Sequence, residues 1–227
     1  MRFKSAALVL SLSLICLVPR TTFADTLTLN TTSGGSPYGV DIYPYQLTLT
    51  TSGGATKQLD LSCINYDREV SFGETWTVDA YVVGSIPSGG LDGESQTAFR
   101  ADAWLFNQYN TGSVSGIGAI TNSQVQYAIW DIMDSSGVNG LSGFDSTAQA
   151  LATKALGEAG SLPTSYYAND VVYVPDTNNQ TGWTNGQPQI FMTDPPPAPT
   201  PEPTSMALLG TGLLGAVGVM RRRLVAA

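Results

Sequence analysis

Few residue types in this chain are suited to catalysis. The sequence of 227 residues contains no histidine and two cysteines, Cys16 and Cys63. The lack of histidine excludes Ser-His-Asp and Cys-His catalysis, histidine metal sites and ordinary histidine acid–base chemistry. We find no Gly-rich phosphate loop that ends in Gly-Lys-Ser/Thr, and no dinucleotide fingerprint after a strand. Paired carboxylates fit glycosidase chemistry, but with so many acidic residues the sequence selects no pair.

Cys63 is the only cysteine of the expected mature domain, because Cys16 lies inside a predicted signal peptide. A single cysteine in an exported protein has no partner for an intramolecular disulfide, and its free thiol is open to oxidation. Its thiolate form is a nucleophile. Cys63 therefore either takes part in chemistry or is a buried, inert thiol, as free cysteines often are.

A glutamine stands out in the segment Val125-Gln126-Tyr127-Ala128-Ile129-Trp130. This segment belongs to a predicted helix whose start is marked by Thr121 and Gln124, which fit a capping box. Gln126 lies about one turn into the helix, and Trp130 follows four residues later on the same face. Taken singly, Gln126 also fits an ordinary polar helix residue and Trp130 a core aromatic.

Together with Leu61-Ser62-Cys63-Ile64-Asn65, this segment resembles the signature pair of bacterial thioester domains. These domains are adhesin modules best known from Gram-positive surface proteins. In that family a cysteine, followed by an apolar and then a polar residue, joins a glutamine in a Gln-x-Ala-apolar-Trp helix. The residue before the cysteine is usually aromatic or leucine in the family, and here it is Ser62. The resemblance implies an internal thioester between Cys63 and Gln126.

In such chemistry the Cys63 thiolate attacks the Gln126 carboxamide carbon and expels ammonia. An amine or hydroxyl group on a partner then attacks the thioester, which forms a covalent link and frees the thiol. We expect a nearby helix N-terminus to favour the thiolate. The bond needs shelter from water, and four aromatic residues are candidate shields: Tyr66, Trp104, Tyr127 and Trp130. This is single-turnover bonding rather than enzyme turnover, and it needs no cofactor or metal.

Residues 1–24 are predicted to form a secretory signal peptide. Arg2 and Lys4 precede an apolar run that is too short to span a bilayer comfortably. Thr22-Phe23-Ala24 places small residues at the two positions that a signal peptidase recognises. We expect no lipidation, because the residue before Cys16 is Ile15 rather than a small residue.

The C-terminal end begins with a stiff Pro-rich linker, residues 195–204. It contains the tripeptide Pro201, Glu202 and Pro203. Residues 205–227 are predicted to form an apolar sorting helix with an Arg cluster, and its apolar run from Met206 to Met220 is marginal for a full membrane span.

Three arginines follow the apolar run: Arg221, Arg222 and Arg223. The positive-inside rule keeps them cytoplasmic, as in an ordinary C-terminal membrane anchor. The order of Pro-Glu-Pro, apolar helix and Arg cluster resembles the PEP-CTERM sorting signal of Gram-negative bacteria. That resemblance implies an exosortase-type sorting protease as a partner and transient passage through the inner membrane. It further implies delivery to the cell surface or extracellular matrix, often with exopolysaccharide production.

Residues 25–194 are predicted to be one extracellular domain, long enough to bury a core without disulfides. The segment Asp25–Thr200 contains 17 acidic residues and four basic ones. Such a domain repels phosphate backbones, so we expect no nucleic acid partner. The acidity suits solubility, or loose association with cations or polysaccharide.

Hydrophobic periodicity predicts an α+β fold, a β-sandwich or barrel-like core with a helical insert of about three helices. Two of the expected helices are Thr97–Tyr109 and the one that begins after Thr121. The third has Asp145 as N-cap and Gly160 as C-cap. Predicted strands lie on both sides of this insert: around Leu27 and Leu29, from Tyr43 to Leu49, Lys57–Asn65, Thr75–Val83, Asp170–Val174 and Gln189–Met192.

Two other functions remain open from the sequence. The domain also fits a noncovalent matrix or carbohydrate-binding module, in which acidity and exposed aromatic residues carry the binding. A glycan-processing hydrolase is a third possibility, which no feature of the sequence favours. Substitution of Cys63 by alanine distinguishes the first two, because it abolishes covalent capture and leaves noncovalent binding intact.

Overall fold

The computed structural model describes residues 24–176 and 188–193. The chain divides into two units, Met1–Asp194 and Pro195–Ala227, and all described residues belong to the first. Residues 1–23 of the predicted signal peptide, the Pro-rich linker and the predicted sorting helix lie outside the described residues.

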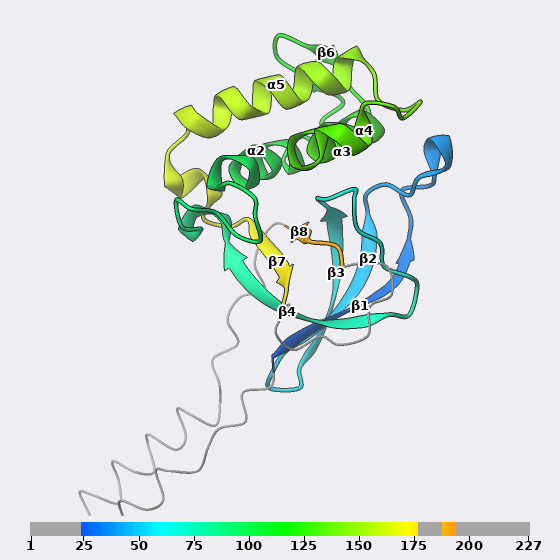
Figure 1. Cartoon of the computed structure of the whole chain (residues 1–227), viewed down its shortest axis with the longest axis vertical. Helices are drawn as coiled ribbons and strands as arrows, with labels where there is room; N and C mark the ends of the chain where they lie inside the picture. Colours follow the sequence, from blue (N-terminus) through cyan, green and yellow to red (C-terminus); the bar gives the residue numbers. More distant parts are fainter. Residues whose placement is uncertain (1–23, 177–187, 194–227) are drawn as a thin grey trace, which may run out of the picture. The chain divides into compact units, whose positions relative to one another are not determined.

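Six antiparallel strands close into a barrel in the order β1-β2-β3-β8-β7-β4 (Figure 1). The strands are β1 (Asp25–Thr32), β2 (Tyr45–Thr50), β3 (Thr56–Cys63), β4 (Thr75–Val82), β7 (Val171–Pro175) and β8 (Phe191–Thr193). The polypeptide between β4 and β7 forms the helices, which lie together beyond one end of the barrel. The predicted α+β fold with a barrel-like core and a helical insert is confirmed.

The barrel interior follows from the period of two in the strands. On β3, Leu59, Leu61 and Cys63 are all buried in one cluster with the inward-facing leucines of β1 and β2. Ser62 lies between two of these residues and therefore faces the opposite side of the strand. It is nevertheless 0% exposed, because the helical layer covers this end of β3. The pleat thus places the thiol and the neighbouring hydroxyl in different layers of the domain.

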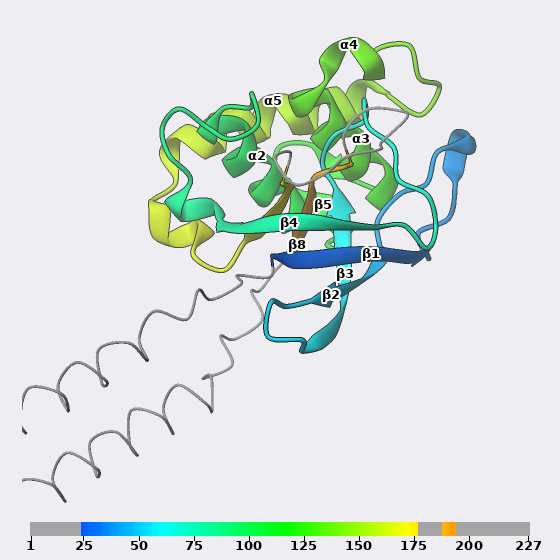
Figure 2. The same cartoon turned by 60° about the horizontal axis from the view of Figure 1, so that its bottom comes forward.

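The helical layer is built from α2 (Gln96–Phe106), α3 (Asn122–Met133), α4 (Ser135–Val138) and α5 (Ser146–Ser161). Helices α2 and α3 lie between the barrel and α5 in Figure 1, and Figure 2 shows the same layer from a second direction. Three short 3-10 helices complete the fold: η2 (Pro37–Gly39), η3 (Val83–Ser85) and η4 (Thr164–Tyr167). The helical layer has its own large apolar core, which the apolar faces of α2, α3 and α5 share.

The predicted helix starts are confirmed. Thr121 caps α3 through a capping box with Gln124, and Asp145 caps α5 by accepting from the backbone N–H groups of Thr147 and Ala148, both at 2.9 Å. The predicted C-cap at Gly160 is wrong. Helix α5 continues to Ser161, and the N–H of Leu162 donates to the carbonyl of Glu158, so the glycine stays inside the helix.

Besides the 3-10 helices, three short elements were not predicted. Strands β5 (Ser113–Val114) and β6 (Gly118–Ala119) pair as a small hairpin between α2 and α3. Helix α4 begins at Asp134, whose carboxylate accepts from the N–H of Gly137 at 3.1 Å. Each element is too short to produce a hydrophobic period.

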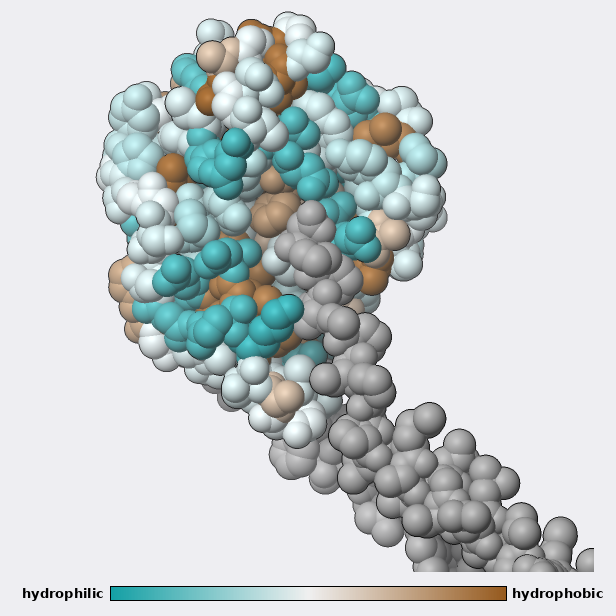
Figure 3. Space-filling model, turned by 180° about the vertical axis from the view of Figure 1, so that it is seen from behind, coloured by the Kyte–Doolittle hydropathy of each residue, from teal (hydrophilic) through white to brown (hydrophobic). Residues whose placement is uncertain are grey.

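Within residues 24–176 and 188–193, no helix is long and apolar enough to cross a membrane. On the face shown in Figure 3, hydrophobic residues form separate patches among polar ones. Among the described residues, the large hydrophobic side chains that are well exposed are Tyr38, Phe72, Leu156 and Tyr166.

Candidate functional site

Gln126, on α3, lies against the end of β3, so the structure brings together the two segments of the predicted thioester. Its side-chain nitrogen, Nε2, donates to the backbone carbonyl of Cys63 at 2.6 Å. Its oxygen, Oε1, accepts from Tyr109 Oη at 2.9 Å, from Ser62 Oγ at 3.2 Å and from the backbone N–H of Tyr43 at 3.2 Å. Gln126, Cys63 and Ser62 are all 0% exposed. A polar amide is therefore fully buried and hydrogen-bonded from several segments of the chain.

Two partners fix the orientation of this amide, because neither can exchange its role. The Tyr43 N–H can only donate, and the Cys63 carbonyl can only accept. Oε1 therefore points towards the donors and Nε2 towards the end of β3. The carbon between them, Cδ, is the atom that a thiol would attack.

The Cys63 thiol donates to the backbone carbonyl of Asn65 at 3.1 Å. Burial raises the pKa of this thiol from 9.0 to about 12, and hydrogen-bonding from the Trp130 side chain and the Asn65 backbone only partly offsets that. The indole N–H of Trp130 meets no partner at full hydrogen-bond geometry among the described residues, but it lies close enough to the thiol to lower its pKa. The expectation that a helix N-terminus favours the thiolate is wrong, because desolvation dominates at this position.

Three of the four predicted shields form one aromatic cluster, and one of them, Trp130, lies near the Cys63 thiol. The ring centroid of Trp130 lies 5.3 Å from that of Tyr66 and 5.3 Å from that of Tyr127. Tyr127 is fully buried, and the backbone at Gly143 packs against its ring so closely that a Cβ there would overlap it. Tyr66 is half-buried, so it forms the outer edge of the cluster.

Trp104, the fourth predicted shield, lies on the α5 side of α2. Lys154 Nζ of α5 is 5.9 Å from the centroid of its ring. Trp104 belongs to the apolar core of the helical layer.

Sequence reasoning missed three of the groups that hold Gln126: Ser62, Tyr109 and Tyr43. Tyr109 follows the end of α2, and its ring stacks on that of Tyr43 with centroids 4.1 Å apart. Burial raises the pKa of Tyr109 well above its ordinary value, so it stays a hydroxyl donor. Ser62 could have been found from the alternation of side chains along β3, because that alternation places Ser62 on the other face of the strand from Cys63. No local pattern marks Tyr43 or Tyr109 as a partner of Gln126.

No group of three or more cysteine, aspartate and glutamate side chains in the described parts of the chain is arranged to hold a metal ion. The site as described therefore consists of a thiol, a carboxamide, two hydroxyls and a backbone N–H.

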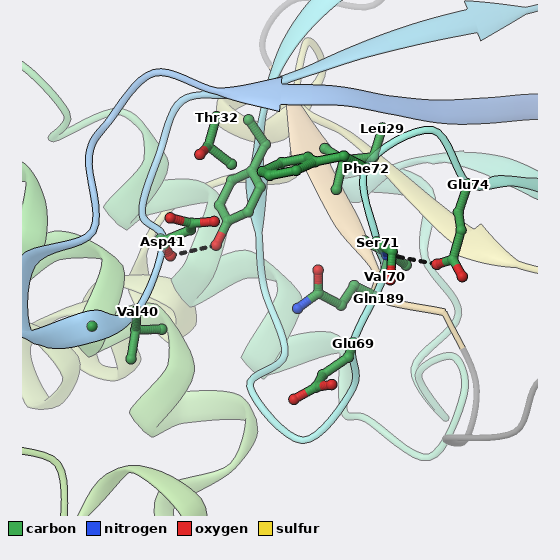
Figure 4. Close-up of a pocket in the computed structure, with 12 residues that line it drawn as sticks. Leu29, Thr32, Val40, Asp41, Glu69, Val70, Ser71, Phe72, Glu74 and Gln189 are labelled. Atoms are coloured by element: carbon green, nitrogen blue, oxygen red, sulfur yellow. Dashed lines mark hydrogen bonds between the residues drawn. The ribbon is translucent and has the colours of Figure 1, made fainter.

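A cavity of about 470 Å³ opens near the same end of the barrel. Figure 4 shows Phe72 and Glu69, from the loop after β3, around it together with Gln189, which precedes β8. Phe72 is 60% exposed. Tyr45 lines the cavity, and its hydroxyl donates to the backbone carbonyl of Asp41 at 2.5 Å.

The comparisons with known proteins identify one sequence motif. Residues 199–223 match the PEP-CTERM protein-sorting motif. This range contains the Pro-Glu-Pro tripeptide and the three arginines singled out from the sequence, so the predicted sorting signal is confirmed. The chain is an exported protein that carries a surface-sorting signal, and the motif implies processing by exosortase-type machinery. No curated protein matches the chain.

Among solved structures, the chain is similar to the pilus-presented adhesin Cpa, with 14% identity and a TM-score of 0.41. That match covers 76% of this chain and 64% of the adhesin. A second match is to the N-terminal domain of the Streptococcus pyogenes pilus tip adhesin Cpa, with 16% identity, a TM-score of 0.38, and coverage of 76% of this chain and 93% of that domain. The Bacillus anthracis TIE protein matches with 12% identity, a TM-score of 0.30, and coverage of 76% and 39%.

Proposed function

We propose that the protein forms an internal thioester between Cys63 Sγ and Gln126 Cδ and uses it for covalent attachment. The target would be an amine or hydroxyl group on a host, matrix or cell-envelope surface. One observation carries this proposal. The Gln126 carboxamide is fully buried, and its Nε2 donates to the Cys63 carbonyl at 2.6 Å, although the two residues are 63 positions apart.

Proximity is the main source of reactivity in this proposal. A thiol with a pKa of about 12 is almost entirely protonated at neutral pH, so no standing thiolate is available. The proposed bond requires the thiol to move beside the amide carbon, and a nucleophile held there reaches an effective concentration far above any in solution. The thiol proton then goes to Nε2, and that nitrogen leaves as ammonia.

The sorting signal is consistent with this use. An exported protein delivered to the cell surface meets amine- and hydroxyl-bearing polymers there, and a buried thioester survives until one of them reaches it. In this proposal the aromatic cluster of Tyr66, Tyr127 and Trp130 limits hydrolysis, because its Trp130 indole lies near the thiol. We place the protein at the surface or matrix of a Gram-negative bacterium, after passage through the inner membrane.

The test is the intact mass of the protein purified after export, beside its Cys63→Ala variant. We expect the wild type to be lighter than its sequence by one ammonia and the variant to have its full mass. A Ser62→Ala variant identifies the bond, because Ser62 Oγ also touches the carboxamide. Loss of ammonia that persists in Cys63→Ala but disappears in Ser62→Ala would show an ester instead. A wild type of full mass with a titratable thiol, in a sample handled without hydrolysis, would refute the proposal.

The cavity beside Phe72 favours a second candidate, a noncovalent carbohydrate-binding module. An exposed aromatic face next to Glu69 and Gln189 combines an apolar platform with hydrogen-bonding groups, as sugar sites do. Under this function, Phe72→Ala abolishes binding to matrix polysaccharide and Cys63→Ala does not. The thioester proposal gives the reverse pattern for covalent capture.

A further inference from the structure

We infer that Ser62 Oγ, Tyr109 Oη and the Tyr43 N–H form an oxyanion pocket around Gln126 Oε1, with Ser62 as a catalytic donor. This inference rests on the proposed thioester and adds how the chain would accelerate both its formation and its opening. Three donors from three separate segments converge on one amide oxygen, at 2.9, 3.2 and 3.2 Å. An amide oxygen has two lone pairs, so two donors satisfy a structural glutamine, and here there are three.

Negative charge develops on Oε1 in both reactions. During closure, the Sγ–Cδ bond forms, the Cδ–Nε2 bond breaks, and the thiol proton leaves with the nitrogen as ammonia. During opening by a primary amine, the new N–Cδ bond forms, the Cδ–Sγ bond breaks, and an amine proton returns to the sulfur. Each path passes through a tetrahedral carbon whose oxygen is the former Oε1. Donors placed at that oxygen before reaction stabilise the charge without reorganising.

The two hydroxyls have fewer protons than contacts. Besides their bonds to Oε1, Ser62 Oγ and Tyr109 Oη lie 3.0 Å from each other. Ser62 Oγ also lies 3.5 Å from the Cys63 carbonyl oxygen. Two protons thus serve four contacts, so when Tyr109 donates to Oε1, the Ser62 proton is shared among Oε1, the Tyr109 oxygen and that carbonyl. A more negative Oε1 attracts that proton away from Tyr109. The Ser62 bond is therefore stronger in the transition state than in the ground state, which is the condition for catalysis.

The chain offers matched variants. Ser62→Ala removes one donor, and Tyr109→Phe removes another while keeping the ring that stacks on Tyr43. Ser123→Ala is the control. Ser123 also lies on α3, and its buried hydroxyl has no hydrogen-bond partner among the described residues.

The experiment follows opening of the thioester by methylamine, using intact mass over time at several methylamine concentrations. We expect Ser62→Ala to lower the second-order rate constant about 100-fold, the lower end of the loss for one oxyanion donor. Tyr109→Phe should slow the reaction by a similar factor, and Ser123→Ala should not change it. Thermal unfolding of each variant separates a folding defect from a rate defect, and Tyr109→Phe decides the question if Ser62→Ala does not fold.

The possible outcomes separate this inference from the proposed function. If the wild type carries a thioester and all variants open at the wild-type rate, the oxyanion pocket is refuted and the thioester stands. A faster reaction in Ser62→Ala or Tyr109→Phe would also refute it, because those groups would then only limit access. If the wild type never loses ammonia, both proposals fail.

Discussion

Opening the proposed thioester should lower the free energy of unfolding by an amount that depends on the length of the loop that the bond closes. The bond would join residues 63 positions apart and so close a loop of that length. If it is treated like a disulfide, the loss of conformational entropy in the unfolded chain stabilises the folded state by about 4 kcal/mol. For a domain of this size, 4 kcal/mol corresponds to a shift of roughly 10 °C in Tm.

Methylamine makes the comparison without any mutation. The treated protein keeps every residue, frees the Cys63 thiol and carries an N-methylamide at Gln126. Urea unfolding of the treated and untreated protein at neutral pH gives the difference in unfolding free energy. Cys63→Ala treated in the same way is the control, and its stability should not change. If the closed and opened forms unfold at the same urea concentration although mass confirms both states, the cross-link reasoning is wrong.

Two further predictions concern the thiol and its shield. In the opened form, the buried Cys63 thiol keeps its proton up to a pKa of about 12, whereas the unfolded chain loses it near 9.0. The stabilisation is therefore complete below pH 9.0 and is lost as the pH rises to about 12. This stabilisation amounts to about 4 kcal/mol. Between pH 9.0 and about 12, the free energy of unfolding measured in urea should therefore fall by about 4 kcal/mol more in the opened form than in Cys63→Ala. Tyr66→Ala should speed hydrolysis of the thioester about tenfold, a change of about 1.4 kcal/mol in the barrier, because it removes the half-buried edge of the cluster. Trp104→Phe, which alters a ring packed near Lys154, should leave the mass-detected hydrolysis rate unchanged, and equal rates in both variants would contradict the shielding role of Tyr66.

Local signals in the sequence predicted the elements well. The capping box at Thr121 and the cap at Asp145 depend on neighbouring residues only, and both helix starts are where these residues place them. The C-cap at Gly160 failed because a glycine permits the left-handed conformation without requiring it.

The candidate site was predictable only in part. The pairing of Cys63 with Gln126 came from a resemblance, and the structure places the two residues in contact. The donors to the amide oxygen were not predictable, because they are defined by tertiary packing. Tyr43 precedes β2, Ser62 lies on the outward face of β3, and Tyr109 follows α2. No periodicity within one segment reports such a convergence.

This convergence also sets the order of events. The donors to Gln126 Oε1 come from segments that are far apart in sequence, so the carbonyl is polarised only after α2 and α3 have packed on β3. In the unfolded chain, no contacts keep the thiol near the amide, so their effective concentration is low. The proposed thioester would therefore form after folding, and a chain that has not yet folded would carry an ordinary cysteine and an ordinary glutamine. For an exported protein this order would matter, because the proposed acyl group would arise only inside the fold that shields it from water and from the wrong nucleophiles.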